Sequence, residues 1–192
     1  MPDEDLWEQL FDVELILERL GVAGLTDLAE LGCGYGTFTV PVAKRILGTL
    51  HAYDMDEAMV ARTEERAAAA GLANVVVDRR DVLEQGFGLA PCSQDGCLLF
   101  NILHHEEPVA ILSAAADIVR PGGRLFATHW RHDPETPRGP DLSIRPRPEQ
   151  IVNWAGETGV LDRAGDVLDL PPWHFGLVLT VTPRRDSLPS ET

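Results

Sequence analysis

A glycine-rich segment near the start of the chain has the residue types and spacing that ligand binding needs. It reads Glu30-Leu31-Gly32-Cys33-Gly34-Tyr35-Gly36 and follows the apolar run 26–31. Glycines let the backbone turn sharply and approach a flat or bulky ligand without an intervening Cβ. Asp54 ends the next apolar run, where a carboxylate can accept hydrogen bonds from ribose hydroxyls. The two features predict a site for a ligand that carries a ribose.

The spacing within the loop separates two classes of ligand. A dinucleotide-binding loop reads G-x-G-x-x-G, whereas this loop reads G-x-G-x-G and has Thr37 where the third fingerprint glycine would fall. Pyrophosphate binding is therefore disfavoured, and Asp54 would repel a 2′-phosphate. An NAD(P)-dependent oxidoreductase on a similar sheet stays open as the alternative enzyme class.

The elements that position these residues alternate along the chain. Apolar residues at three- and four-residue steps predict an amphipathic lead helix over 3–20. Apolar runs predict strands over 26–31, 49–54, 75–77, 97–101 and 124–130, with helical spacing between them, and the run 75–77 is expected to be buried. Alternating strands and helices predict right-handed crossovers and a mainly parallel sheet. We therefore expect an α/β fold, a Rossmann-like doubly wound sheet with helices on both faces.

The last third of the chain departs from this alternation. Five prolines exclude a regular element from 131–148, so a long ordered loop is expected there. Pro148 is suited to the first turn of a helix that ends near Gly159. The short link between the strand candidates 167–170 and 175–181 predicts an antiparallel hairpin. Residues 1–183 are thus expected to form a single domain and 184–192 a disordered tail.

Composition limits the partners and the compartment. A net charge of -15 on 192 residues, from 31 acidic and 16 basic side chains, opposes binding to DNA, structured RNA or anionic lipid. There is no apolar run of about 18 residues and the start of the chain is acidic, so neither a membrane span nor a signal peptide is expected. Cys33, Cys92 and Cys97 form no CxxC pair. These features predict a cytoplasmic protein without a metal site.

In these residues the chain resembles the class I S-adenosylmethionine-dependent methyltransferases, in the small-molecule group of types 11 and 25. The resemblance covers about 26–181. Its landmarks occur in the family's order, as Glu30–Gly36, Tyr53-Asp54-Met55-Asp56, Arg80-Asp81-Val82, Asn101–His105 and Val119-Arg120-Pro121-Gly122-Gly123. The resemblance implies a seven-stranded sheet whose last strand is antiparallel. It implies S-adenosylmethionine as cofactor and S-adenosylhomocysteine as product.

The resemblance also implies a role for individual residues of the cofactor site. Asp54 would take the ribose hydroxyls, Met55 would pack on adenine, and Asp81 would accept from the adenine amino group beside the Val82 N–H. Glu30 would help to hold the methionine ammonium through nearby groups. The residues implied around the methionine part and the transferred methyl are Gly32, Gly34, Tyr35, Gly36 and Asn101.

Candidates for catalysis and for acceptor binding follow the fourth and fifth strands. His104 or His105 is placed to act as a base near neutral pH; the alternatives are that the pair caps the next helix or only contacts the cofactor. His129, Trp130 and Arg131 are candidates for an acceptor pocket, with ordinary packing as the alternative. Arg138, Arg145 and Arg147 offer binding to an anionic acceptor or, alternatively, surface ion pairs.

Two motifs of nucleic-acid methyltransferases bear on the acceptor. Pro91-Cys92 precedes the fourth strand, whereas the cytosine-5 enzymes have their Pro-Cys after it. Asn101 is followed by Ile102-Leu103 and not by the Pro-Pro-aromatic sequence of the amino-directed enzymes. Together with the charge, these differences predict methyl transfer to a small molecule and no binding to nucleic acid. A monomer or homodimer is expected. A non-catalytic cofactor-binding or partner protein is the third alternative.

Overall fold

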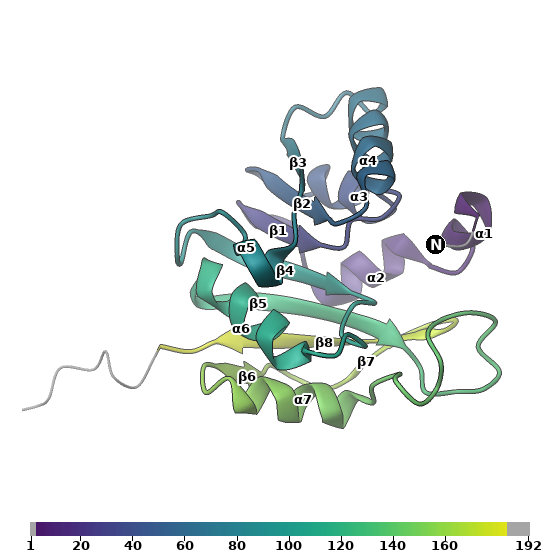
Figure 1. Ribbon diagram of the computed structural model, residues 1–192, viewed down its shortest axis with the longest axis vertical. Helices are drawn as coiled ribbons and strands as arrows, with labels where there is room; N and C mark the ends of the chain where they lie inside the picture. The colour runs from purple at the N-terminus through teal and green to yellow at the C-terminus, as the bar shows by residue number, and fades with distance from the viewer. Residues whose placement is uncertain (1–2, 184–192) are drawn as a thin grey trace, which may run out of the picture.

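A single sheet of eight strands forms the centre of the computed structural model, which describes residues 3–183 (Figure 1). The strand order is β3-β2-β1-β4-β5-β8-β6, with β7 also paired to β8. The strands are β1 (Leu28–Leu31), β2 (Leu50–Asp54), β3 (Val75–Arg79), β4 (Gln94–Phe100), β5 (Val119–Trp130), β6 (Leu161–Arg163), β7 (Leu168–Leu170) and β8 (His174–Val181). The strands from β1 to β5 pair in parallel, and β8 runs antiparallel to each of its neighbours.

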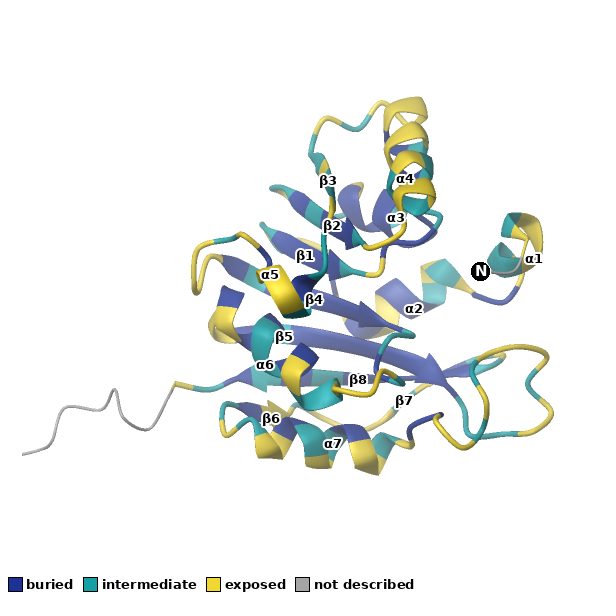
Figure 2. Ribbon diagram, viewed as in Figure 1, coloured by how far each residue is buried: buried dark blue, intermediate teal, exposed yellow. Residues whose placement is uncertain are grey.

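Helices cover both faces of this sheet, as expected for a doubly wound fold. They are α1 (Glu4–Glu8), α2 (Val13–Leu20), α3 (Thr39–Ala43), α4 (Glu57–Ala69), α5 (Val82–Gln85), α6 (Pro108–Ile118) and α7 (Pro148–Glu157). Side chains of α2 and α3 contribute to one buried core, whereas those of α6 and α7 contribute to another. Figure 2 shows that the strands at the centre of the sheet are buried and that the helices carry exposed residues. From β1 the chain first adds β2 and β3 on one side and then β4 and β5 on the other. The strand order therefore reverses between β1 and β4, the place where open α/β sheets bind ligands.

The expected number of seven strands is wrong by one, because the outermost position of the sheet is divided. Both β6 and β7 pair with the same edge of β8, β6 at Leu179–Val181 and β7 at His174–Gly176. The Ala164 N–H still donates to the carbonyl of Val178 (2.8 Å), and the chain then leaves the ladder at Gly165, whose φ is 82°. The sequence indicated β7 and β8 as a hairpin, which is confirmed, but gave no strand at β6.

The single lead helix over 3–20 is also wrong, because the segment folds as two helices. Asp3 caps α1 by accepting from the Asp5 N–H (3.1 Å), and Asp12 starts α2 by accepting from the Leu15 N–H (3.1 Å). Between the helices, Leu10 and Phe11 are buried in the core. An Asp side chain readily accepts hydrogen bonds from the free N–H groups at a helix start. Asp12 therefore begins a new helix, although the spacing of apolar residues predicts one continuous helix through this point.

Strand β3 differs from its expected burial. It lies at the edge of the sheet and pairs only with β2, so the side chain of Val76 is 49% exposed. An apolar run predicts a strand, but it does not show whether that strand lies at the centre or at the edge of the sheet. The central strands β1 and β4 are buried along nearly their whole length.

The segment between β5 and α7 has the irregular path that its prolines require, and Pro148 begins α7 as expected. One buried side chain holds this segment together. The Arg145 guanidinium donates to the Thr136 hydroxyl and to the carbonyls of Arg131, Asp133, Arg138 and Pro140. The expected tail, 184–192, lies outside the described residues. Within 3–183, no helix is long and apolar enough to cross a membrane.

Candidate functional site

The glycine loop bends from the end of β1 toward the end of β2. The Gly32 and Cys33 N–H groups both donate to the carbonyl of Tyr53, at 2.8 and 3.0 Å. Gly32 has φ of 78°, in the left-handed region, and a Cβ there would lie 2.9 Å from Cγ2 of Ile102. A glycine is therefore needed at this position both for the turn and for the close approach of the β4–α6 loop.

Asp54, at the end of β2, ties the loop to the sheet. Its Oδ2 accepts from the Gly34 N–H (2.9 Å) and its Oδ1 accepts from the Asp56 N–H (3.0 Å). An ionised carboxylate has about four acceptor positions, so these two bonds leave capacity for hydroxyl donors of a ligand. The side chain lines a cavity beside the loop.

Asp81 supplies a second carboxylate after β3. It caps α5 through Oδ1, which accepts from the N–H groups of Leu83 (3.0 Å) and Glu84 (3.3 Å). Val82 follows as the first residue of α5 and is buried. The cap fixes Asp81 at the rim of the same cavity, with Oδ2 outside these two bonds.

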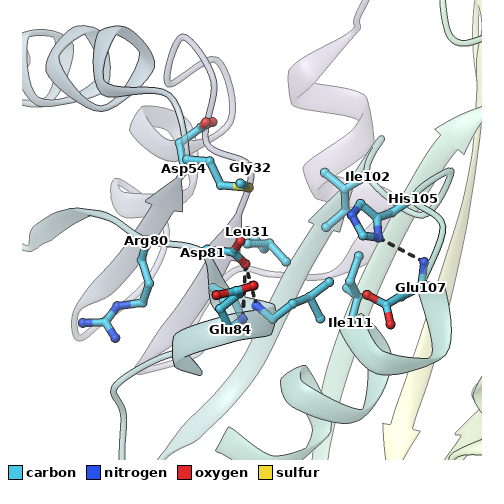
Figure 3. A pocket seen from close by; sticks show the side chains of 13 residues that line it. Leu31, Gly32, Asp54, Arg80, Asp81, Glu84, Ile102, His105, Glu107 and Ile111 are labelled. Atoms are coloured by element: carbon cyan, nitrogen blue, oxygen red, sulfur yellow. Dashed lines mark hydrogen bonds between the residues drawn. The ribbon is translucent and has the colours of Figure 1, made fainter.

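The cavity has a volume of about 340 Å³ and lies at the carboxyl ends of β1, β2 and β4 (Figure 3). Of the residues expected in the site, it brings together Gly32, Asp54, Met55, Asp81, Val82 and His105. Met55 follows Asp54 in the chain, lines the cavity and is 62% exposed. The sequence reasoning missed the rest of the lining, which is Leu31, Arg80, Leu83, Glu84, Ile102, Glu107 and Ile111. Leu31, Arg80 and Ile102 lie within the landmark segments and Leu83 directly follows one, which was the available signal. Glu84, Glu107 and Ile111 do not adjoin a landmark.

Glu30 lies beneath the glycine loop and not on the cavity wall. Its carboxyl group is fully buried and accepts a hydrogen bond from the Thr39 hydroxyl (2.6 Å). Burial raises the pKa of Glu30 to about 8, with a smaller contribution from the negative charge of Asp54 and an opposing one from the Thr39 bond. Glu30 therefore stays largely protonated at neutral pH unless a cation comes close.

Asn101 ends β4 in an unusual conformation, with φ of 57°. Its N–H donates to the carbonyl of Thr128 (2.9 Å), but its side-chain amide is buried with neither Oδ1 nor Nδ2 bonded to any described residue. Buried amide groups are nearly always paired. This amide is therefore available to pair with water or with a polar group of a ligand at the end of β4. Gly34, Tyr35, Gly36 and Asn101 are not among the residues that line the 340 Å³ cavity.

The two adjacent histidines have different environments. His105 is exposed, and its Nδ1 accepts from the Glu107 N–H (3.0 Å), a bond that fits a role at the start of the next helix. His104 is half-buried, and its Nδ1 lies 3.3 Å from Nε2 of His129. Burial, and secondarily the charge of His105, lowers the pKa of His104 below its ordinary 6.5. Of the two, only His104 has a buried hydrogen-bond partner that can orient its ring.

The three residues that end β5 and follow it are not gathered around one pocket. Trp130 is buried in the core and packs edge-on against Trp7, which agrees with an ordinary packing role. Arg131 pairs with Asp169 and donates to the carbonyl of His174 (3.2 Å). His129 is fully buried and lines neither the cofactor cavity nor the surface; its ring contacts His104 through a hydrogen bond.

These donors and acceptors fit the parts of S-adenosylmethionine. The Asp54 carboxylate has free acceptor positions for the hydroxyls of a ribose, and the Asp81 carboxylate has a free oxygen that can accept from an amino group. The apolar side chains of Val82, Ile102 and Ile111 offer a dry surface for a flat base. The unpaired amide of Asn101 offers a further polar partner. The sulfonium of this cofactor carries a methyl group that is already electrophilic. The protein therefore has mainly to orient the cofactor and the acceptor and to exclude water.

Comparison with protein families and curated proteins identifies the same chemistry. A family model described as a methyltransferase domain matches residues 28–123. The ubiquinone biosynthesis O-methyltransferase of Pseudomonas paraeruginosa is 28% identical over 166 residues, which cover 77% of this chain and 69% of the relative. The nocamycin O-methyltransferase of Saccharothrix syringae is 31% identical over 118 residues, covering 60% of this chain and 40% of the relative.

Solved structures share the fold. A SAM-dependent methyltransferase from Aquifex aeolicus superposes with a TM-score of 0.82 at 23% identity and covers 94% of both chains. The [4+2]-cyclase SpnF superposes with a TM-score of 0.74 at 16% identity, over 91% of this chain and 80% of its own. Because one of these neighbours is a cyclase, the fold by itself does not specify the reaction.

Proposed function

The chain belongs to the methyltransferase domain family and is a small-molecule methyltransferase dependent on S-adenosylmethionine; from this we propose that the atom it methylates is a hydroxyl oxygen. The names of its curated relatives support this proposal, since both the ubiquinone and the nocamycin enzymes are O-methyltransferases. The observation that carries the cofactor dependence is the meeting of the glycine loop with Asp54 and Asp81 in one cavity at the switch point of the sheet.

Within this proposal, each side chain of the cavity has a binding role. Asp54 accepts from the ribose hydroxyls while it keeps the glycine loop in place through Gly34. Asp81 accepts from the adenine amino group, the Val82 N–H donates to the base, and Met55 covers it. Holding donor and acceptor in line, away from water, is the main contribution of a protein to such a transfer. Asn101 is proposed to contact the cofactor through its unpaired amide.

These residues fit an oxidoreductase or a non-catalytic protein less well than they fit a methyltransferase. The loop lacks the third glycine of a dinucleotide fingerprint, which disfavours NAD(P) as cofactor. A non-catalytic protein would have no need of the oriented, half-buried His104 beside the cofactor cavity. We further propose that the protein is a monomer or homodimer. The net charge of -15 supports the absence of a nucleic-acid partner, and the three free cysteines support a cytoplasmic location.

Two measurements test the proposed function. Calorimetric titration with S-adenosylhomocysteine and, separately, with NAD is expected to show binding of the first only; binding of NAD alone contradicts the proposal. Transfer of labelled methyl from S-adenosylmethionine is then measured on matched phenols, anilines and thiols. We expect the phenols to be labelled, and labelling confined to anilines or thiols would contradict the hydroxyl assignment.

A further inference from the structure

A second cavity adjoins the cofactor cavity and shares His105 with it. Its volume is about 450 Å³, and it lies between the β4–α6 loop, the segment 143–146 and α7. Leu103, Val109 and Trp154 give it apolar walls, and His104 lies among them. A cavity with these walls beside the cofactor suits an apolar or aromatic acceptor.

The charges around this cavity disfavour an anionic acceptor. Glu106 and Glu157 contribute carboxylates to its lining. Arg145 is the one cation among the described lining residues, and its guanidinium is engaged by four carbonyls and a hydroxyl of its own loop. An uncharged alcohol or phenol fits better. Such an acceptor keeps its proton until it reacts, so the reaction needs a base.

The ring nitrogens around His104 define which atom can act as that base. In His129, Nδ1 lies 3.5 Å from the carbonyl of Trp130, which can only accept, so the proton of His129 belongs on Nδ1. Its Nε2 then has a lone pair that accepts from Nδ1–H of His104 across 3.3 Å. The remaining nitrogen of His104, Nε2, consequently carries a lone pair and no proton.

The surroundings keep both rings neutral at physiological pH. Burial is the main cause that lowers the pKa of His129 to about 3; the charges of His104 and Arg145 contribute in the same direction, and the hydrogen bond to the Trp130 carbonyl opposes them. The groups that face the pair are His105 on the same loop, His174 on β8, Arg145 in the proline-rich segment, and Glu106 and Glu157 at the cavity. A neutral His104 with a free Nε2 is the form in which imidazole accepts a proton.

We propose that this second cavity binds an uncharged hydroxyl compound, that Nε2 of His104 takes its proton, and that His129 is the positioning residue that fixes the His104 tautomer. This inference rests on the proposed methyl transfer to oxygen. As the O–H bond breaks, the proton passes to Nε2 and the oxygen forms a bond to the methyl carbon. The methyl–sulfur bond breaks with its electron pair left on sulfur, so atoms and charge balance.

The tautomer is measured without any acceptor or cofactor. Long-range ¹H–¹⁵N spectra of histidine-labelled protein separate Nδ1–H from Nε2–H imidazole, and His104→Asn identifies the His104 signals. We expect His104 as Nδ1–H in the wild type and in His129→Gln, whose side-chain oxygen can still accept. In His129→Leu we expect Nε2–H to become populated. An Nε2–H form in the wild type overturns the proposal.

The catalytic part is measured by kcat and KM on the phenol that is turned over fastest. His129→Leu is expected to lower kcat roughly 10-fold or more with KM for the cofactor unchanged, and to shift the acidic limb of the kcat–pH profile. His129→Gln is expected to retain more activity than His129→Leu, the reverse of what apolar packing alone predicts. The matched control is His174→Leu, which removes another buried imidazole and is expected to keep the wild-type profile.

These outcomes separate the two proposals. If phenols are methylated but His129→Leu and His129→Gln have the wild-type pH profile, the dyad is refuted and the proposed function stands. Faster turnover of carboxylate-bearing phenols than of their uncharged counterparts would refute the acceptor class. If S-adenosylhomocysteine does not bind, the proposed function fails whatever the tautomer of His104.

Discussion

Replacement of Asp54 by alanine is expected to weaken cofactor binding sharply. The carboxylate already accepts from the N–H groups of Gly34 (2.9 Å) and Asp56 (3.0 Å), and the proposed ribose contacts use its remaining acceptor positions. Hydrogen bonds to a charged group contribute about 1.5–3 kcal/mol. The dissociation constant for S-adenosylhomocysteine should therefore rise roughly 10- to 150-fold, measured by isothermal titration calorimetry.

The same variant also loosens the loop, and a matched control separates the two effects. Asp54→Ala leaves two backbone N–H groups without their acceptor, at a cost of about 1 kcal/mol each in the free energy of unfolding. Asp56→Ala removes a carboxylate two residues away that caps α4 by accepting from the Ala58 N–H (2.9 Å), and a lost cap costs about 1 kcal/mol. The control should lose stability and keep its affinity. Equal affinities for wild type and Asp54→Ala would refute the ribose assignment.

Three further predictions concern buried polar groups. Because the pKa of Glu30 is raised to about 8 from an ordinary 4.5, the folded state holds an extra proton between these values and stability falls as pH rises; Glu30→Gln should remove up to about 1.4 kcal/mol of this loss per pH unit in urea unfolding. The pKa of His174 is lowered to about 3 from 6.5 by burial, so stability falls as pH drops below 6.5; His174→Leu should reduce that slope by a similar amount in the same assay. Arg145→Lys cannot serve the five oxygens that Arg145 does, and it should lower stability by about 1–3 kcal/mol in thermal unfolding and speed limited proteolysis within 131–147. An unchanged proteolysis rate would mean that Arg145 does not hold the segment.

The parts of the fold that were predictable are those fixed by local chemistry. Apolar runs between helical spacings gave the parallel strands and their crossovers, and the glycine loop gave the switch point. The division of the lead segment at Asp12 and the exposure of Val76 could not be predicted from the spacing of apolar residues. In the first case a side-chain cap outcompetes helix continuation, and in the second the position of a strand in the sheet decides its burial.

The cofactor side of the site was more predictable than the acceptor side for a physical reason. Asp54 is the last residue of β2, and Gly32 and Asp81 come just after β1 and β3, so a parallel sheet brings the three to one edge. The acceptor cavity is formed between the β4–α6 loop, the proline-rich segment and α7, whose contact depends on long-range packing. His129 and His104 are both visible in the sequence, but their pairing depends on the parallel register of β4 with β5.

The internal bonding of Arg145 bears on how an acceptor is selected. A segment rich in proline and placed over a site suggests a lid, yet this one is held at its centre by a buried guanidinium bonded to four of its own carbonyls. Buried donors and acceptors satisfied in this way resist opening, because each exposed carbonyl must find a new partner. The segment therefore acts as a fixed wall. Acceptor choice then depends on the shape of that wall and on the carboxylates of Glu106 and Glu157, and substitutions at Ile144 or Trp154 are expected to change which phenols are methylated without changing affinity for the cofactor.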